Sequence, residues 1–183
     1  VQDGIPAPDP TTPEGAALLH HDNTFGTPEE DAFRRDFTIN ALFYDIATFS
    51  VIDYVGGLDD LRAGVVRSIG DPTVRFHEDP VRMLRAVRFA AKLDFNLSPE
   101  AEEPIARLGW LLADVPPARL FDELIKLFHS GHAARSFDLL QRYDLLRYLF
   151  RDTQAVLETA EGKTVAEFIR RGLANTDARI RDD

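Results

Sequence analysis

The chain has 183 residues, of which 31 are acidic and 21 basic, so its formal net charge is −10. With 44% hydrophobic residues and 13 phenylalanines it can bury a substantial core, which argues against a disordered chain. It has no cysteine and no apolar run long enough to cross a membrane. We therefore expect no disulfide, no metal–thiolate centre, no membrane segment and a cytoplasmic setting. By net charge alone, a nucleic-acid partner is disfavoured.

Residues 1–21 are predicted to form a flexible arm or the stump of a loop. Four of the eleven prolines lie in the first 17 residues, where they prevent a regular helix or strand. The chain also begins without methionine and with a segment rich in proline and aspartate. We therefore expect a fragment excised from a longer protein.

Residues 22–70 are predicted to form a small piece of mixed helix and strand. Thr27 has the position of an N-cap and Pro28 that of a first helical residue, with acidic residues following. The aromatic and β-branched segment 41–55 predicts the end of a helix followed by a hairpin or short strands. After two glycines, one helical turn and then a short strand at 65–69 are expected.

Residues 71–183 are predicted to be helical throughout. Apolar residues recur at three- and four-residue steps in the blocks 80–93, 98–113, 117–130 and 132–142, with a weaker pattern at 153–174. In the third block, one apolar stripe is expected to pack on neighbouring helices: Leu120, Phe121, Leu124, Leu127 and Phe128. The predicted fold class is therefore α+β and mostly α-helical, with a boundary near residue 70.

The segment 75–92 contains five basic and two acidic side chains, so it is locally positive. Asp79 is placed to cap a helix that starts at the next proline, and three-residue steps then fan Arg82, Arg85 and Arg88 across the helix. Such arginines suit phosphate oxygens, and Asp79 near Arg82 offers the acceptor and donor that read the edge of an unpaired base. On these residues alone, a solvated face of salt bridges is the commoner explanation.

A second cluster contains Arg34, Arg35, Asp36, Thr38 and Asn40. Its charges could bind a triphosphate or a metal ion. On sequence alone, we favour the simpler interpretation that Asp36 caps a helix boundary and Asn40 holds a neighbouring loop.

A third cluster places Gly56 and Gly57 between Asp53 and Asp59. The glycines could cradle an anion or form a hinge. A tight turn in which Asp59 caps the following helix is the favoured interpretation.

Several segments, taken in order, resemble the class II template-independent nucleotidyltransferases, the family of bacterial poly(A) polymerases and CCA-adding tRNA nucleotidyltransferases. The resemblance runs from about residue 22 to at least residue 150. Within the family, the DNTFG-x-PEED segment and Pro116-Pro117-Ala118-Arg119 look more like poly(A) polymerases. The segments that carry the resemblance are RRDFTINALFYD (34–45), VIDYVGGLDDLRAGVVRSIG (51–70), RFHEDPVRMLRAVRFAAKLDF (75–95) and PPARLFDELIKLF (116–128).

The resemblance implies a fold and an activity. Residues 22–70 would be part of a nucleotidyltransferase head, and residues 71–183 a helical neck and body. The implied reaction adds AMP from ATP to RNA 3′ ends with Mg²⁺ as cofactor, so the implied partners are ATP and an RNA 3′ end, in RNA and mRNA processing. The alternatives are a CCA-adding tRNA nucleotidyltransferase and a helical RNA-binding module without catalysis.

The resemblance also implies roles for single residues. The EDxxR segment would pair with the incoming base in place of a template, and its later arginines would extend this contact to the rest of the nucleotide. The RRD segment would supply a phosphate ligand and a member of the catalytic carboxylate group. The implied nucleotide-binding residues are Arg35, Asp79, Arg82, Arg85 and Arg88, and the implied catalytic residue is Asp36.

One part of the family pattern is missing. The Gly-Ser loop and the Asp-x-Asp pair that hold the metal ions in this family occur nowhere in the 183 residues. We therefore assign no metal ligand here, expect the main ligands upstream of this chain, and expect the fragment alone to be inactive.

Overall fold

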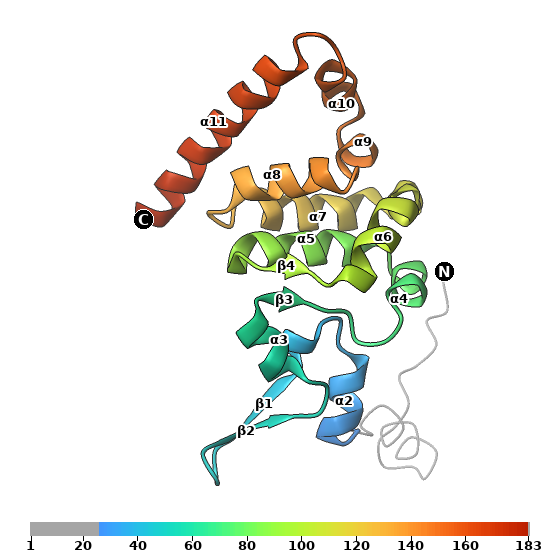
Figure 1. The fold of residues 1–183 in the computed structure, drawn as a ribbon, viewed down its shortest axis with the longest axis vertical. Helices are drawn as coiled ribbons and strands as arrows, with labels where there is room; N and C mark the ends of the chain where they lie inside the picture. Colours follow the sequence, from blue (N-terminus) through green and yellow to red (C-terminus); the bar gives the residue numbers. More distant parts are fainter. Residues whose placement is uncertain (1–25, 183) are drawn as a thin grey trace, which may run out of the picture.

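A computed structural model describes residues 26–182 of the chain. The predicted arm at 1–21 and the residues 22–25 lie outside the described residues. Strands and short helices gather at one end of the long axis, and stacked helices form the rest of the molecule (Figure 1). The fold is α+β and mostly helical, as the sequence predicts.

The helix α2 (Pro28–Arg34) begins where the sequence predicts. Thr27 and Glu30 form a reciprocal capping box, in which the Glu30 amide donates to Thr27 Oγ1 at 3.2 Å and the Thr27 amide donates to Glu30 Oε2 at 2.8 Å. The helix ends at Arg35, where the backbone becomes extended. The RRD segment therefore spans the C-terminal end of this helix.

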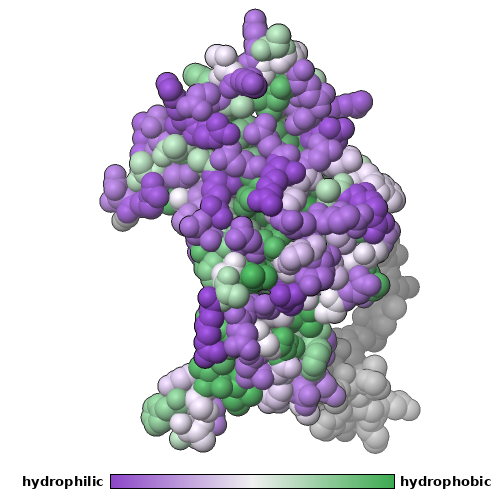
Figure 2. Space-filling model, in the orientation of Figure 1, coloured by the Kyte–Doolittle hydropathy of each residue, from purple (hydrophilic) through white to green (hydrophobic). Residues whose placement is uncertain are grey.

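A 3₁₀ turn, η1 (Thr38–Asn40), leads into the predicted hairpin, which is confirmed as β1 (Leu42–Asp45) paired antiparallel with β2 (Ser50–Asp53). The hairpin projects from the rest of the molecule (Figure 1). Hydrophobic atoms gather at its tip (Figure 2), where Ile46 and Phe49 are each 79% exposed.

The helix α3 (Gly57–Ala63) follows the hairpin, and the short strand β3 (Val65–Val66) pairs in parallel with β4 (Asn96–Leu97). The strand is shorter than predicted because its partner strand ends at Leu97. Beyond that point, Ser68 instead pairs with Phe37 in an isolated antiparallel bridge. These pairings join the hairpin end of the molecule to the helical part.

The other described elements are helical. The predicted blocks 117–130 and 132–142 are confirmed, whereas the block 98–113 divides into an α-helix and a 3₁₀ helix, and the weak block 153–174 covers two helices. Two short helices, α4 and α9, lie outside these predicted blocks, and the strand β4 interrupts the part of the chain that was predicted to be helical throughout. In chain order the helices are α4 (Pro72–Glu78), α5 (Val81–Leu93), α6 (Pro99–Leu108), η2 (Gly109–Asp114), α7 (Pro117–Phe128), α8 (Ala133–Arg142), α9 (Leu146–Leu149), α10 (Arg151–Leu157) and α11 (Gly162–Asp182).

The main hydrophobic core surrounds α5, which lies in a stack with α7 and α8 (Figure 1). Met83, Leu84 and Val87 on α5 have no exposed surface. Their counterparts Leu127 on α7 and Leu140 on α8 are equally buried. Burial of one face of α5 fixes the rotation of this helix, so its arginines must emerge on the remaining sides.

The predicted apolar stripe on α7 is wrong for Phe121, which is 62% exposed. Leu127 is fully buried and Leu120 and Leu124 pack against the core, so the centre of the stripe is correct. A rotation of about 100° per residue carries Phe121 past the edge of the packed face. Among residues 26–182, no helix is long and apolar enough to span a membrane.

Candidate functional site

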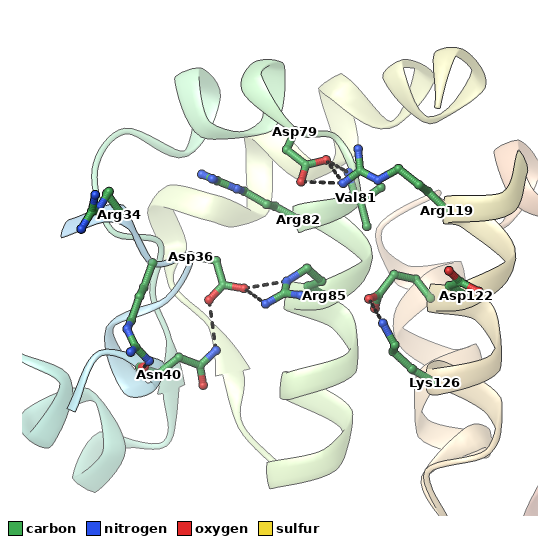
Figure 3. A pocket seen from close by; sticks show the side chains of 12 residues that line it. Arg34, Asp36, Asn40, Asp79, Val81, Arg82, Arg85, Arg119, Asp122 and Lys126 are labelled. Atoms are coloured by element: carbon green, nitrogen blue, oxygen red, sulfur yellow. Dashed lines mark hydrogen bonds and ion pairs between the residues drawn. The ribbon is translucent and has the colours of Figure 1, made fainter. Parts of the chain in front are cut away.

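A cavity of about 720 Å³ lies between the C-terminal end of α2, the start of α5 and the first turns of α7 (Figure 3). Six basic and four acidic side chains line it, so it is locally positive in a chain of net charge −10. Its size and charge suit a small polyanionic ligand. The lining residues are Arg34, Arg35, Asp36, Asn40, Asp79, Val81, Arg82, Arg85, Arg119, Asp122, Glu123 and Lys126.

The fold brings together two segments that the sequence analysis treats separately. One of the six expected site residues, Arg88, does not line the cavity. Its Nε donates to Oε2 of Glu123, a lining residue, at 3.2 Å. The segments 34–40 and 79–85 form one surface. The other five expected site residues all line the cavity: Arg35, Asp36, Asp79, Arg82 and Arg85.

Asp36 is 9% exposed and is held from several sides. Its Oδ1 accepts from its neighbour's amide, that of Phe37, at 2.9 Å and from Asn40 Nδ2 at 3.1 Å. Its Oδ2 accepts from Arg85 Nε at 2.7 Å and lies close to Nη2 of the same guanidinium (Figure 3). A carboxylate offers about four acceptor positions, so this geometry fills them with protein donors.

Arg35 is fixed at the edge of the cavity. Its Nη2 donates to Asp31 Oδ2 at 2.8 Å, its Nη1 donates to the carbonyl of Asn40 at 2.8 Å, and its guanidinium lies 5.0 Å from the centre of the Phe43 ring. The stack and the two bonds together hold the planar group in one orientation.

Asp79 lies at the junction between α4 and α5 and is the C-cap residue of α4. The helix α5 begins at Val81, one residue later than predicted, and its N-cap is Pro80 rather than Asp79. Asp79 Oδ1 nevertheless accepts from the amide of Val81 at 3.3 Å. This bond ties the carboxylate, which lines the cavity, to the start of α5.

The side chains of Asp79 and Arg82 do not bond to each other; only their main chains do, where the Arg82 amide donates to the Asp79 carbonyl at 3.1 Å. Both oxygens of Asp79 instead accept from Nη2 of Arg119, at 3.1 and 3.0 Å (Figure 3). Arg119 lies on α7, forty residues further along the chain. Arg119 also lines the cavity, a role that its place in the Pro-Pro-Ala-Arg segment did not indicate.

Arg82 carries a buried donor that no group among residues 26–182 accepts from. Its Nη1 is buried, has no hydrogen-bond partner among the described residues, and lies 3.5 Å from Glu78 Oε2. Burial first, and then the like charge of Arg75, lower the pKa of Arg82, while the nearby carboxylates oppose this shift. A buried N–H whose nearest carboxylate oxygen is 3.5 Å away is costly.

Glu123 lies between two cations on the α7 side of the cavity. It is 4% exposed, and its two oxygens accept from Arg88 Nε at 3.2 Å and Lys126 Nζ at 2.9 Å. The Arg88 guanidinium also lies 4.6 Å from the centre of the Phe89 ring. Nothing in the sequence pattern of α7 indicated this buried carboxylate, because its partner Arg88 lies 35 residues away.

The third cluster of the sequence analysis forms a tight turn. Asp53, rather than the expected Asp59, caps α3, because its carboxylate accepts from the amides of all four residues 55–58 at 2.9 to 3.0 Å. Burial raises the pKa of Asp53, but these four bonds outweigh it and hold the pKa below its usual value. The amides are thereby taken, so the turn offers no cradle for an anion. A Cβ on Gly57 would lie 2.2 Å from the carbonyl oxygen of Thr38, so only glycine fits there.

The described residues do not fit a magnesium site. Between residues 26 and 182, no group of three or more histidine, aspartate or glutamate side chains is arranged to hold a metal ion. The expected catalytic carboxylate, Asp36, has its acceptor positions filled by protein donors.

Two family models match the chain. Residues 11–67 match the model of the poly A polymerase head domain. Residues 94–157 match the model described as the probable RNA and SrmB-binding site of polymerase A. The cavity takes lining residues from both matched segments and from the segment between them.

Relatives cover nearly the whole chain. Poly(A) polymerase I of Salmonella typhimurium is 51% identical over 166 residues, which are 91% of this chain and 36% of that protein. The CCA-adding enzyme of Bacillus licheniformis is 41% identical over 121 residues, which are 66% of this chain and 30% of that protein. The chain therefore spans about a third of the length of these relatives.

Solved structures share the fold. A crystal structure of the Bacillus stearothermophilus CCA-adding enzyme in complex with CTP superposes with a TM-score of 0.63 at 40% identity, covering 68% of this chain and 31% of that one. The Thermotoga maritima CCA-adding enzyme complexed with tRNA superposes with a TM-score of 0.61 at 32% identity, with the same coverage of both chains.

Together, the fold and these similarities place the chain in a family of nucleotidyltransferases. The chain belongs to the class II nucleotidyltransferase family, as its motifs indicated. Within the family, the relatives named poly(A) polymerase I match a larger share of the chain at higher identity than those named CCA-adding enzyme.

Proposed function

We propose that this chain is the nucleotide-selecting segment of an RNA nucleotidyltransferase that adds AMP from ATP to RNA 3′ ends. The observation that carries this proposal is the basic cavity, whose lining includes both the side chain of Arg82 and the carboxylate of Asp79. A donor and an acceptor on one cavity surface are the minimum needed to read the edge of an unpaired base.

Adenine fits this pair. Its exocyclic amino group would donate to Asp79, and its ring nitrogen N1 would accept from Arg82. Uracil and guanine carry a proton at the corresponding ring nitrogen, so they would leave the Arg82 donor facing another donor. Cytosine presents the same donor and acceptor as adenine, so the pair alone does not separate these two bases.

The remaining arginines would bind the rest of the nucleotide. We propose that Arg35 reaches the phosphates and that Arg85 and Arg88 extend the contact to the nucleotide. Each of the three guanidinium groups is now held by a carboxylate of the protein. On binding, each guanidinium would exchange a carboxylate of the protein for an anionic group of the nucleotide. Each guanidinium would therefore keep an anionic partner.

The proposed reaction is an in-line displacement at the α-phosphorus of ATP. The RNA 3′ hydroxyl forms the new P–O bond, and the bond to the pyrophosphate oxygen breaks. The residues of the cavity would hold the nucleotide in the orientation that this attack requires. For Asp36 to act as a catalytic carboxylate, Arg85 must release it first. The proposed Mg²⁺ would need carboxylates other than those that the structure describes.

RNA would contact the helical part of the chain. The family model that matches residues 94–157 is described by its probable RNA binding, and the solved Thermotoga maritima relative is a complex with tRNA. We propose that these helices guide an RNA 3′ end to the cavity, in cytoplasmic RNA processing that includes mRNA.

CCA addition is the second candidate. Solved relatives with the same fold are CCA-adding enzymes, one in complex with CTP and one with ATP. The base pattern described above is compatible with both nucleotides, so the two activities share this site.

Nucleotide binding tests the site directly. We expect ATP to bind the chain and the exchange Arg82→Ala to weaken binding at least about tenfold, because the base loses a charge-assisted hydrogen bond. Titration calorimetry with ATP, CTP, GTP and UTP measures this. Arg107→Ala is the matched control, because Arg107 is exposed and, within the part of the chain that the structure describes, pairs only with Glu103 on the same helix. Equal affinity of the Arg82→Ala variant and the wild-type chain would overturn the assignment.

Nucleotidyl transfer needs the full-length protein that contains this segment. We expect it to extend an RNA primer with long tails when ATP is supplied alone. Gel electrophoresis of the products with each nucleotide separates the candidates. Addition of a short C-then-A end to tRNA would favour the CCA-adding alternative, and no extension with any ribonucleotide would reject both.

A further inference from the structure

Arg75 lies outside the cavity wall and yet holds the main chain of two residues that form it. Its Nη2 donates to the carbonyl oxygens of Arg34 at 3.1 Å and Arg35 at 2.8 Å. The side chain of Arg75 is only 17% exposed, so these bonds are shielded from water. The contact joins α4 to the C-terminal end of α2 across forty residues of sequence.

The same guanidinium also reaches towards the opposite wall. Its Nη1 donates to Glu78 Oε2 at 2.9 Å, and this oxygen lies 3.5 Å from Arg82 Nη1. A chain of polar contacts therefore runs from the carbonyls at the end of α2, through the side chains of Arg75 and Glu78, to Nη1 of Arg82.

The end of α2 needs such a cation. The last carbonyl groups of a helix have no partner within the helix, and a positive charge there is favourable. Without Arg75, the carbonyls of Arg34 and Arg35 lose their only side-chain donor among the described residues. The main chain that carries both arginines into the cavity would then be free to move, and errors of about 1 Å suffice to impair a binding geometry.

We propose that Arg75 is a positioning residue that sets the relative placement of the two cavity walls. It fixes the main chain of Arg34 and Arg35 on one side and, through Glu78, orients Arg82 on the other. Arg75 itself touches no nucleotide. This role rests on the proposed function, because it concerns the same nucleotide site.

Affinity measurements on the whole chain test the role. We expect Arg75→Ala to weaken ATP binding about tenfold, since two hydrogen bonds to a charged group are lost. Arg75→Lys should recover part of the affinity, because its ammonium can still reach a carbonyl. In the double variant Arg75→Ala/Arg82→Ala, we expect the fold-loss of ATP affinity to be smaller than the product of the two single fold-losses. The reason is that part of the effect of Arg75 is exerted through Arg82, which the double variant lacks. ATP affinity within about twofold of wild type for Arg75→Ala, or independent effects in the double variant, would overturn the proposal.

Hydrogen exchange separates this proposal from the proposed function, because it needs no ligand. The amide of Arg35 bonds to the carbonyl of Ala32, and that of Thr38 to the carbonyl of Arg67. We expect both to exchange faster in Arg75→Ala, and to be unchanged in the control Arg107→Ala. If the wild-type chain binds no ATP but these amides respond, the nucleotide function fails and the positioning of the wall stands. Unchanged exchange in Arg75→Ala rejects the positioning role.

Discussion

Single carboxylates fix several positions on which the site and the fold depend. Asp36, just after the end of α2, accepts from Arg85 on α5. Asp53 accepts from the amides at the start of α3. Asp79, just before α5, accepts from Arg119 on α7. In each case the carboxylate oxygens accept the hydrogen bonds. For Asp53, whose pKa these bonds lower, protonation is linked to the stability of the local structure.

Asp53 gives this linkage a measurable form. Its pKa is lower in the folded chain than in the unfolded chain, so its contribution to stability is present above the unfolded pKa, about 3.9, and is lost as pH falls through the folded pKa. We expect Asp53→Asn to lower the free energy of unfolding by about 1 kcal/mol at neutral pH. Urea unfolding should show the gap between wild type and variant closing in acid.

The neighbouring exchange Asp59→Asn is the control for this experiment. The Asp59 side chain is 87% exposed and pairs only with Arg62 in the same helix, so its replacement should change stability little at any pH. A gap for Asp53→Asn that is the same in acid as at neutral pH would contradict the linkage.

At the scale of elements, α11 shows how a long helix is attached to the stack. Asp177, 5% exposed, accepts from the amides of Ala133 at 2.6 Å and Ala134 at 3.0 Å. These amides belong to the start of α8, so a residue of α11 supplies the cap that α8 lacks in its own sequence. Arg170 adds an exposed ion pair to Asp138 on α8.

Removing this cap should loosen the attachment of α11. We expect Asp177→Ala to lower the free energy of unfolding by about 2 kcal/mol, because it leaves two amides at a buried helix start without acceptors. Chemical denaturation monitored by circular dichroism measures this. Asp182→Ala, at an exposed position near the end of the same helix, should have almost no effect. Equal stability of the two variants would show that the cap contributes nothing.

At the scale of the whole molecule, charge is distributed unevenly. The chain carries a net charge of −10, while the cavity is lined by six basic and four acidic side chains. A negative surface repels polyanions at long range, and the local cluster attracts them only at short range. The net charge that disfavours a nucleic-acid partner therefore does not describe the site.

This distribution predicts the response of nucleotide binding to salt. We expect ATP affinity to fall several-fold between about 0.05 M and about 0.5 M salt, because screening weakens attraction to the cavity. Lys126→Gln should reduce the slope, since Lys126 is a half-exposed cation of the cavity wall. Calorimetry at several salt concentrations provides the slopes. An affinity that does not depend on salt would argue against phosphate binding by these side chains.

Local patterns in the sequence predicted local structure well. The cap at Thr27 and the hairpin after it follow from neighbouring residues and are confirmed. The short helix α4 also had a local signal that was not used: Asp71 accepts from the amide of Thr73, and a proline stands at the first helical position. Such signals depend on residues within one helical turn.

Partners distant in sequence were not predictable in this way. The pairing of Asp79 with Arg119 and of Arg88 with Glu123 depends on how α5 and α7 pack. The spacing of residues 79 to 88 placed Asp79 near Arg82 and gave no sign of Arg119 as its partner. Hydrophobic periodicity gives the buried side of each helix but not the rotation between two helices, and that rotation decides which charged side chains meet.

The three walls of the cavity come from segments that only folding brings together. Bonds that close it join residues 40 and 49 positions apart in the chain. A nucleotide held by all three walls would have no comparable site on the unfolded chain, so its binding energy would add to the stability of the fold. At a concentration of one hundred times the dissociation constant, this addition is about 2.7 kcal/mol. The resistance of this segment to unfolding and proteolysis would then rise and fall with the supply of its own substrate.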